Sequence, residues 1–265
     1  MYSKFQLGLK YLNYYFSASN SKGHGMHSPF VFEFITRVLN DKKTYPAYSQ
    51  VENLRRQMLS DQTLLSVQDF GAGSLVDKTN QRSIASIAKN AAKPAKFGQL
   101  LYRMVRHYQP TTILELGTSL GISTAYLSLA NPGASIITME GASFIAEKAR
   151  RNFNTLKLQN VSIKEGNFDQ ALPTVTSQLS SFDFAFIDGN HRREPTESYF
   201  RQLLPITHND SILIFDDIHW SQGMEQAWET IKQHPAVRCT IDIFFIGIVL
   251  FRQEFKEKQH FTIRF

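Results

Sequence analysis

The sequence lacks the features that mark several large classes of protein. It contains one cysteine, Cys239, in 265 residues, which rules out an intrachain disulfide framework. Its longest apolar run, Ile243 to Phe251, is far too short to span a bilayer. The first twenty residues hold no continuous apolar segment followed by small residues, so no secretory signal peptide is expected. These absences favour a soluble, cytoplasmic protein with no membrane partner.

Acidic residues are scarce in the N-terminal third. Residues 1–95 hold twelve Lys and Arg against six Asp and Glu, whereas residues 96–265 hold seventeen of each. The whole formal excess of +6 therefore belongs to the first third of the chain. These positive residues are dispersed as on an ordinary solvated face, so nucleic acid is a less favoured partner than a small-molecule substrate.

Length and composition divide the chain into two predicted domains. Residues 1–95 are expected to form a basic, helical extension rich in aromatic side chains, and the loop at 23–29 suits a lid over a substrate. His24 and His27 in this loop have no cysteine or carboxylate at ligand spacing, so a metal site there is not favoured. Residues 96–265 are expected to form a ligand-binding α/β domain.

Apolar runs alternate with helical patterns through residues 96–265. The predicted strands after the first are 135–139, 161–165, 182–187 and 211–216, and the helices are 143–155, 169–179, 195–204 and 222–233. Two further strands, 239–245 and 247–252, are too close together for a helical crossover and should pair antiparallel. The tail 254–265 could add an edge strand. The expected fold is α/β: a Rossmann-like, doubly wound, mostly parallel seven-stranded sheet with an antiparallel C-terminal strand.

The most informative stretch is Thr111 to Ala130, TTILELGTSLGISTAYLSLA. An apolar strand breaks at Gly117, and a helix begins after Gly121. The glycines allow the backbone to approach a ligand closely. The free amides at the helix start, with the hydroxyls of Ser123 and Thr124, suit an anionic group. This stretch therefore predicts a loop that binds an anionic ligand.

Several alternative ligands and loops do not fit. A dinucleotide fingerprint would need glycine where Ser119 and Ile122 stand, and a phosphate-binding P-loop would need a lysine after Gly121. A second glycine-rich segment, Gln68 to Ser74, follows a thin predicted strand and is not followed by an acid about 20 residues later. It is interpreted as a turn.

The motif E-L-G-T-S-L-G, followed 25 residues after its glutamate by Glu140, resembles the class I methyltransferases that use S-adenosylmethionine. The resemblance implies that Glu115 lies by the methionine end of the cofactor and that Glu140 binds the ribose hydroxyls. It also places Asn167 and Phe168 at the adenine. The remaining cofactor contacts that it implies are Gly117, Thr118, Ser119, Gly121, Ser123, Gly141 and Asp188.

Two later motifs, F-A-F-I-D-G-N-H (184–191) and L-I-F-D-D-I-H-W (213–220), resemble the divalent-metal O-methyltransferases of the catechol and caffeoyl-CoA type. The resemblance implies that Asp188, Asp216 and Asp217 hold Mg²⁺ or a similar cation. Asp217 stands where the family has asparagine, and His191 stands in place of a lysine base. His191 and His219 are therefore the candidate proton acceptors, with Asp188 as a further catalytic residue.

The function predicted from the sequence is an S-adenosylmethionine-dependent methyltransferase. It would methylate a hydroxyl oxygen of a small molecule with the help of a divalent metal. The alternatives are a metal-independent methyltransferase acting on nitrogen or nucleic acid, and a non-catalytic cofactor-binding interaction protein. The sequence does not identify the methyl acceptor or the oligomeric state, and a homodimer is compatible with it.

Overall fold

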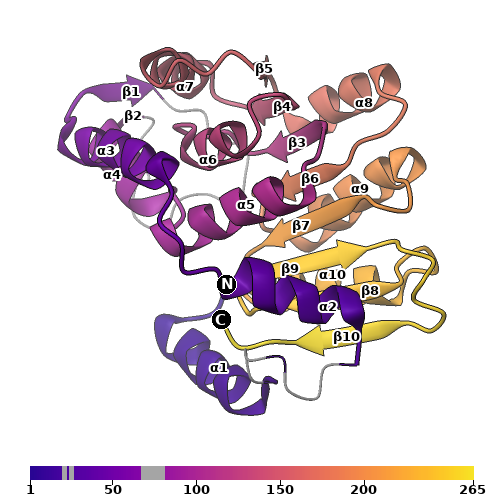
Figure 1. The fold of residues 1–265 in the computed structure, drawn as a ribbon. Coiled ribbons are helices and arrows are strands. Elements are labelled where there is room, and N and C mark those ends of the chain that lie inside the picture. The colour runs from indigo at the N-terminus through magenta and orange to yellow at the C-terminus, as the bar shows by residue number, and fades with distance from the viewer. Residues whose placement is uncertain (20–22, 24–26, 67–80) are drawn as a thin grey trace. The chain divides into compact units, whose positions relative to one another are not determined.

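A computed structural model describes residues 1–19, 23, 27–66 and 81–265 (Figure 1). These residues form two compact units. The middle unit comprises residues 41–171, and the terminal unit joins residues 1–40 to residues 172–265. The domain boundary expected near residue 95 stays a prediction.

The middle unit alternates helices and strands. Its parallel strands follow the order β3-β4-β5, and a short antiparallel hairpin pairs β1 with β2. Its elements are α3 (Pro46–Ser60), β1 (Leu64–Ser66), β2 (Gln81–Ser83), α4 (Ile84–Asn90), α5 (Ala95–Tyr108), β3 (Thr112–Leu116), α6 (Ile122–Ala130), β4 (Ser135–Glu140), α7 (Ser143–Thr155) and β5 (Val161–Glu165). Helix α8 (Phe168–Gln178) begins in this unit.

The terminal unit contains both chain ends. Its strands follow the order β10-β8-β9-β7-β6, in which β9 is antiparallel to both of its neighbours. Its remaining elements are α1 (Lys4–Ser17), α2 (Pro29–Glu33), a π-helical turn η1 (Phe34–Leu39), β6 (Phe184–Ile187), α9 (Arg193–Leu203), a 3₁₀ turn η2 (Leu204–Ile206), β7 (Ile212–Asp216), α10 (Gln222–Gln233), β8 (Cys239–Asp242), β9 (Ile246–Leu250) and β10 (Gln259–Thr262).

Strand register brings the predicted site residues to common edges. In the middle unit Leu116 pairs with Met139, and Glu140 pairs with Glu165. In the terminal unit Ile187 pairs with Phe215, so the acids that follow or end these strands, Asp188 and Asp216, are neighbours in register. Parallel strands therefore place residues far apart in sequence at the same carboxyl edge.

Close packing explains two glycines. A Cβ added to Gly98 of α5 would lie 2.5 Å from the ring of Tyr126 on α6. A Cβ on Gly247 of β9 would lie 2.7 Å from the ring of Trp228 on α10. Both aromatic rings are fully buried. Gly98 thus leaves room for Tyr126 between two helices, and Gly247 leaves room for Trp228 between a strand and a helix.

The expected α/β fold with mostly parallel strands is confirmed. The predicted hairpin is β8 and β9, and the tail adds an eighth strand, β10, which pairs parallel with β8 at the end of the strand order. The segment Gln68 to Ser74 and His24 lie outside the described residues. Among the described residues, no helix is long and apolar enough to cross a membrane.

Candidate functional site

Three residues of the glycine loop after β3 have positive φ angles. Gly117 has φ 107°, Ser119 has φ 48° and Gly121 has φ 82°. The amides of Gly117 and Thr118 both donate to the carbonyl of Met139, 3.0 Å away, which fixes the loop against β4. A Cβ on Gly121 would lie 2.4 Å from the ring of Phe153, so this position also requires glycine for space.

Helix α6 begins at Gly121 without a side-chain cap. Its first turn carries Ser123, which is half-buried, and Thr124, which is buried. Amides at an uncapped helix start attract negative charge. The geometry of the loop suits an anionic group, and the predicted ligand contacts of the loop stay predictions.

Glu115, which precedes the loop on β3, is fully buried. Its Oε2 accepts hydrogen bonds from Thr124 (2.5 Å) and Thr138 (2.6 Å). Burial raises the pKa of Glu115 above its ordinary value, although hydrogen bonds from Ser123, Thr124 and Thr138 oppose the rise. This acid ties β3, β4 and α6 together from inside the unit.

Glu140 ends β4 and lies against the glycine loop. Its Oε2 accepts from the amide of Ser119 (2.8 Å), and its Oε1 accepts from the amide of Ala142 (2.9 Å). Each carboxylate oxygen can accept more than one hydrogen bond, so these contacts orient the group and leave capacity for ligand hydroxyls. The adjacent Gly141 is half-buried.

The third strand end in the middle unit carries Asn167 and Phe168. The carbonyl of Asn167 accepts from Gln170 and Ala171, and its Oδ1 accepts from the amide of Asp169 at 3.1 Å. Asn167 therefore caps α8, which is the ordinary structural role of such a residue. Phe168 is half-buried at the helix start.

In the terminal unit the described residues contain one group of three metal-binding side chains. Asp188, His191 and Asp216 each offer a ligand atom, and these atoms all lie within 4.8 Å of one another. His191 Nε2 is 3.5 Å from Asp188 Oδ1, and Asp216 is 1% exposed. Two carboxylates and an imidazole can hold a divalent cation.

The loop that carries His191 has a strained backbone. Asn190 has φ 68° and His191 has φ 25°, in the region that non-glycine residues rarely adopt. Asn190 is held by a hydrogen bond to the Tyr199 hydroxyl (3.0 Å) and by one from Arg192 (2.7 Å). Strain that is held in place by such contacts often occurs at functional sites.

Asp217, expected as the third metal ligand, does not belong to this three-residue group. Its backbone has φ 53°, its amide donates to the carbonyl of Phe245 (2.6 Å), and its carbonyl accepts from Trp220 (2.9 Å). The left-handed turn directly after Asp216 thus changes the direction of the chain. The structure brings His191 to Asp188 and Asp216, and a metal-binding role for Asp217 stays a prediction.

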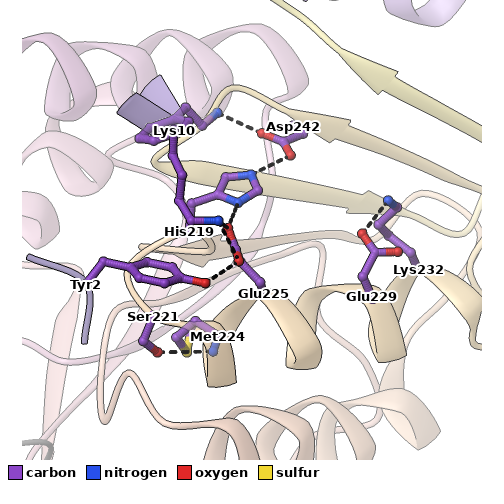
Figure 2. A network of polar contacts seen from close by, with 10 residues as sticks. Tyr2, Lys10, His219, Ser221, Met224, Glu225, Glu229, Lys232 and Asp242 are labelled. Carbon is purple, nitrogen blue, oxygen red and sulfur yellow. Dashed lines mark hydrogen bonds and ion pairs between the residues drawn. The ribbon is translucent and has the colours of Figure 1, made fainter. Parts of the chain in front are cut away.

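His219 takes part in a network of charged side chains (Figure 2). Its Nδ1 is 3.0 Å from Glu225 Oε1, and its Nε2 is 2.8 Å from Asp242 Oδ2. Burial alone would lower the pKa of His219, but the two carboxylates outweigh it and raise the pKa. The two carboxylates fix the orientation of the ring, and the role of His219 as a proton acceptor stays a prediction.

No sequence pattern indicates the other members of this network. Tyr2 donates to Glu225 Oε2 (2.7 Å), and Lys10 lies 3.0 Å from Glu225 Oε1. Their partner is more than 200 residues away in the chain. Sequence periodicity relates residues only a few positions apart, so it does not indicate contacts over this separation.

Part of the chain is similar in sequence to known methyltransferases. Residues 114–218 match a family model described as a methyltransferase domain. A catechol O-methyltransferase of Niastella koreensis is 29% identical over 150 residues, covering 55% of this chain and 66% of the relative. One of Mycobacterium tuberculosis is 27% identical over 129 residues, covering 48% and 57%. The chain thus matches less than two thirds of the length of these curated relatives.

Solved structures extend the likeness to most of the chain. The O-methyltransferase TomG from Streptomyces achromogenes, solved with S-adenosylmethionine, has a TM-score of 0.57 and 19% identity, covering 84% of this chain and 95% of that one. At this identity the likeness establishes the fold. Together with the methyltransferase domain matched at residues 114–218, the fold supports the resemblance to the class I methyltransferases seen in the sequence.

Proposed function

We propose that this chain transfers the methyl group of S-adenosylmethionine to a hydroxyl oxygen of a small molecule with the help of a divalent cation. The observation that carries the proposal is the convergence of Asp188, His191 and Asp216 within 4.8 Å. This convergence is what the O-methyltransferase resemblance leads one to expect of the acids after β6 and β7. The catechol O-methyltransferase relatives support the same reaction class.

The middle unit would bind the cofactor. Glu140, oriented by the amides of Ser119 and Ala142, would accept hydrogen bonds from the ribose hydroxyls. The uncapped start of α6 would face the carboxylate of the methionine end. Glu115 would act indirectly, because it is buried and fixes Thr124 and Thr138. Further contacts are proposed from Gly117, Thr118, Ser119, Gly121, Ser123, Gly141, Asn167 and Phe168, with Asp188 from the terminal unit.

The terminal unit would bind the cation. Asp188 and Asp216 supply hard oxygen donors, which suit Mg²⁺, and the imidazole of His191 suits Mn²⁺ and other transition metals better. The donor set therefore fits a divalent cation and favours Mn²⁺ over Mg²⁺. When bound, such a cation stabilises a deprotonated hydroxyl and orients it.

Positioning should supply most of the rate enhancement. Holding two reactants in line for a displacement can contribute about 7–11 kcal/mol. Asp188 and Asp216 would hold the cation that orients the acceptor oxygen. The strained backbone at Asn190 and His191 would fix the direction of the His191 side chain. His191 has two candidate roles, as the third donor to the cation or as the acceptor of the hydroxyl proton.

Calorimetric titration tests the two halves of the proposal separately. Wild-type protein should bind S-adenosylmethionine without added metal, and it should bind Mn²⁺ more tightly than Mg²⁺. It should methylate a compound with two adjacent hydroxyls in a reaction that a chelator stops. Absence of heat with the cofactor would refute the methyltransferase, whereas cofactor binding and chelator-resistant turnover would favour the metal-independent alternative.

Replacement of His191 by alanine separates its two roles. A donor role predicts weaker Mn²⁺ binding. A base role predicts unchanged Mn²⁺ binding with a turnover about 10²–10⁴-fold lower, the range for loss of a general base. If neither quantity changes, His191 has no part in the reaction.

A further inference from the structure

Helix α1 presents two apolar faces. Leu7, Tyr11, Tyr14 and Ala18 recur at intervals of four and three residues, and so do Phe5, Leu9, Leu12 and Phe16. At 3.6 residues per turn these two series lie on opposite sides of the helix. A helix of a single chain needs one apolar face, so the second requires its own explanation.

The inner face is covered by the terminal unit itself. Tyr14 and Ala18 are buried in a cluster with Phe244, against which Leu7, Tyr11 and Phe245 also pack. The rings of Tyr11 and Phe244 meet edge to face at a centroid distance of 5.1 Å. Tyr14 also donates to the carbonyl of Ile263 and accepts from the amide of Phe265, which fixes α1 beside the chain end (Figure 1).

The outer face is exposed. Phe5 is 74% exposed, Leu9 and Leu12 are each 52% exposed, and Phe16 is 79% exposed. Gly8 adjoins this face, and a Cβ there would meet nothing within 4 Å. The spacing of the four apolar residues is that of the a and d positions of a coiled coil, the pattern by which one helix packs along another.

The charge distribution selects the partner. Within α1 the charged residues are Lys4 and Lys10, and neither belongs to the outer face. The positions that flank the seam hold Gln6, Gly8, Asn13 and Tyr15, so two copies of this face meet without repulsion between like charges. An anionic membrane would need a cluster of about four to eight cations, and Lys10 is already paired with Glu225.

We propose that the outer face of α1 packs against the same face of a second copy of this chain. The interface would be isologous, because one self-complementary patch serves both partners. Two phenylalanines and two leucines on each copy would bury roughly 800–1,000 Å² in total, below the roughly 1,200–2,000 Å² of stable interfaces and within the range of weak ones. The dimer is therefore weak and depends on concentration.

Sedimentation velocity on the full-length protein, over a range of concentrations at physiological ionic strength, tests the pairing. Wild type should shift from monomer to dimer as concentration rises. Leu9→Glu and Leu12→Glu should remain monomeric with unchanged circular dichroism, because both positions are exposed. Phe144→Glu, which removes another exposed apolar side chain (60% exposed, on α7), should dimerise like wild type.

A cysteine probe gives a second measurement. The single native cysteine, Cys239, is buried, so Leu12→Cys would introduce the reactive thiol. Oxidation should give a covalent dimer faster than it does for Phe144→Cys. Equal rates, a wild type that stays monomeric throughout, or a dimer that survives Leu12→Glu would overturn the proposal. So would a monomer that binds phosphatidylserine vesicles through Leu12.

Discussion

Two glutamates, one in each unit, are held by different kinds of neighbour. Glu115 in the middle unit is fully buried and is bonded to the hydroxyls of Thr124 and Thr138. Glu225 in the terminal unit is partly buried and is bonded to Tyr2, Lys10 and His219. Burial by itself would raise the pKa of both carboxyls. For Glu225 the hydrogen bonds and the charge of Lys10 outweigh burial, so its pKa is lowered. For Glu115 the hydrogen bonds from the hydroxyls do not outweigh burial, so its pKa is raised.

The difference follows from burial: Glu115 is completely buried and its hydroxyl donors do not offset the cost, whereas Glu225 is partly buried and its hydrogen bonds from Tyr2, Lys10 and His219 do. The two units also differ in the interactions that hold these regions in place. The glycine loop is held by backbone amides and hydroxyls, whereas the surroundings of His219 are held by ion pairs. Each construction can be disturbed without changing the other.

The largest effects on ligand affinity are expected from replacing one carboxylate in each unit. Asp216→Asn should weaken Mn²⁺ binding at least about 10–100-fold and reduce turnover at least as much, with S-adenosylmethionine affinity unchanged. Glu140→Gln should do the reverse and weaken the cofactor about 10–100-fold through loss of charged hydrogen bonds. Calorimetry with each ligand on each variant measures this. If both variants lose both ligands, the assignment of one ligand to each unit is wrong.

The largest effect on stability is expected from Gly121→Ala. The left-handed backbone and the clash with Phe153 should together cost about 2–5 kcal/mol of the free energy of unfolding. Gly133→Ala is the matched control, because a Cβ there would meet only Asn131 Oδ1 at 3.4 Å. Urea unfolding of both variants gives the comparison, and an equal stability of the two would contradict the packing described here.

Glu225→Gln should destabilise the protein by about 1–2 kcal/mol near neutral pH, because Lys10 and His219 lose a shared anion. Since the pKa of Glu225 is lowered, the wild-type advantage is present above the ordinary value of 4.5 and is lost as pH falls through the lowered pKa. Unfolding free energies should therefore converge in acid. A difference that persists there would point to a packing defect.

Glu115→Gln should show the opposite pH dependence and the smallest effect, up to about 1 kcal/mol. The raised pKa means that the folded protein favours the protonated acid, so wild type loses stability as pH rises from 4.5 through the raised pKa. The glutamine variant should become the more stable of the two over this range. Melting temperatures of both proteins across it test the sign.

Much of the fold could be predicted from local pattern. Helix α7 and strand β5 have the predicted bounds, 143–155 and 161–165, because their apolar periodicity is regular and their ends carry turn residues. Ser28 caps α2 and Pro29 takes its first position, a combination that marks a helix start in the sequence itself. These features depend on neighbours within a few residues.

Other features depend on distant residues or on backbone detail. Strand register explains why Asp188 and Asp216 lie close together. His191 joins them through a left-handed backbone at residues 190 and 191, and because neither residue is glycine, the sequence does not indicate that backbone. Both carboxylate partners of His219 lie on other elements, α10 and β8. A histidine near acids has the same sequence pattern whether it is a catalytic base or a member of an ion-pair network, so the catalytic role of His219 stays a prediction.

The position of α1 has a consequence during protein synthesis. Tyr2 bonds to a residue 223 positions later, and Tyr14 to one 249 positions later. A ribosome releases the chain from its N-terminus, so this helix emerges long before its partners exist. Its aromatic side chains must stay solvated or be held by chaperones until the segments that they contact are translated, and premature termination before residue 244 would leave Tyr11 and Tyr14 without the ring of Phe244.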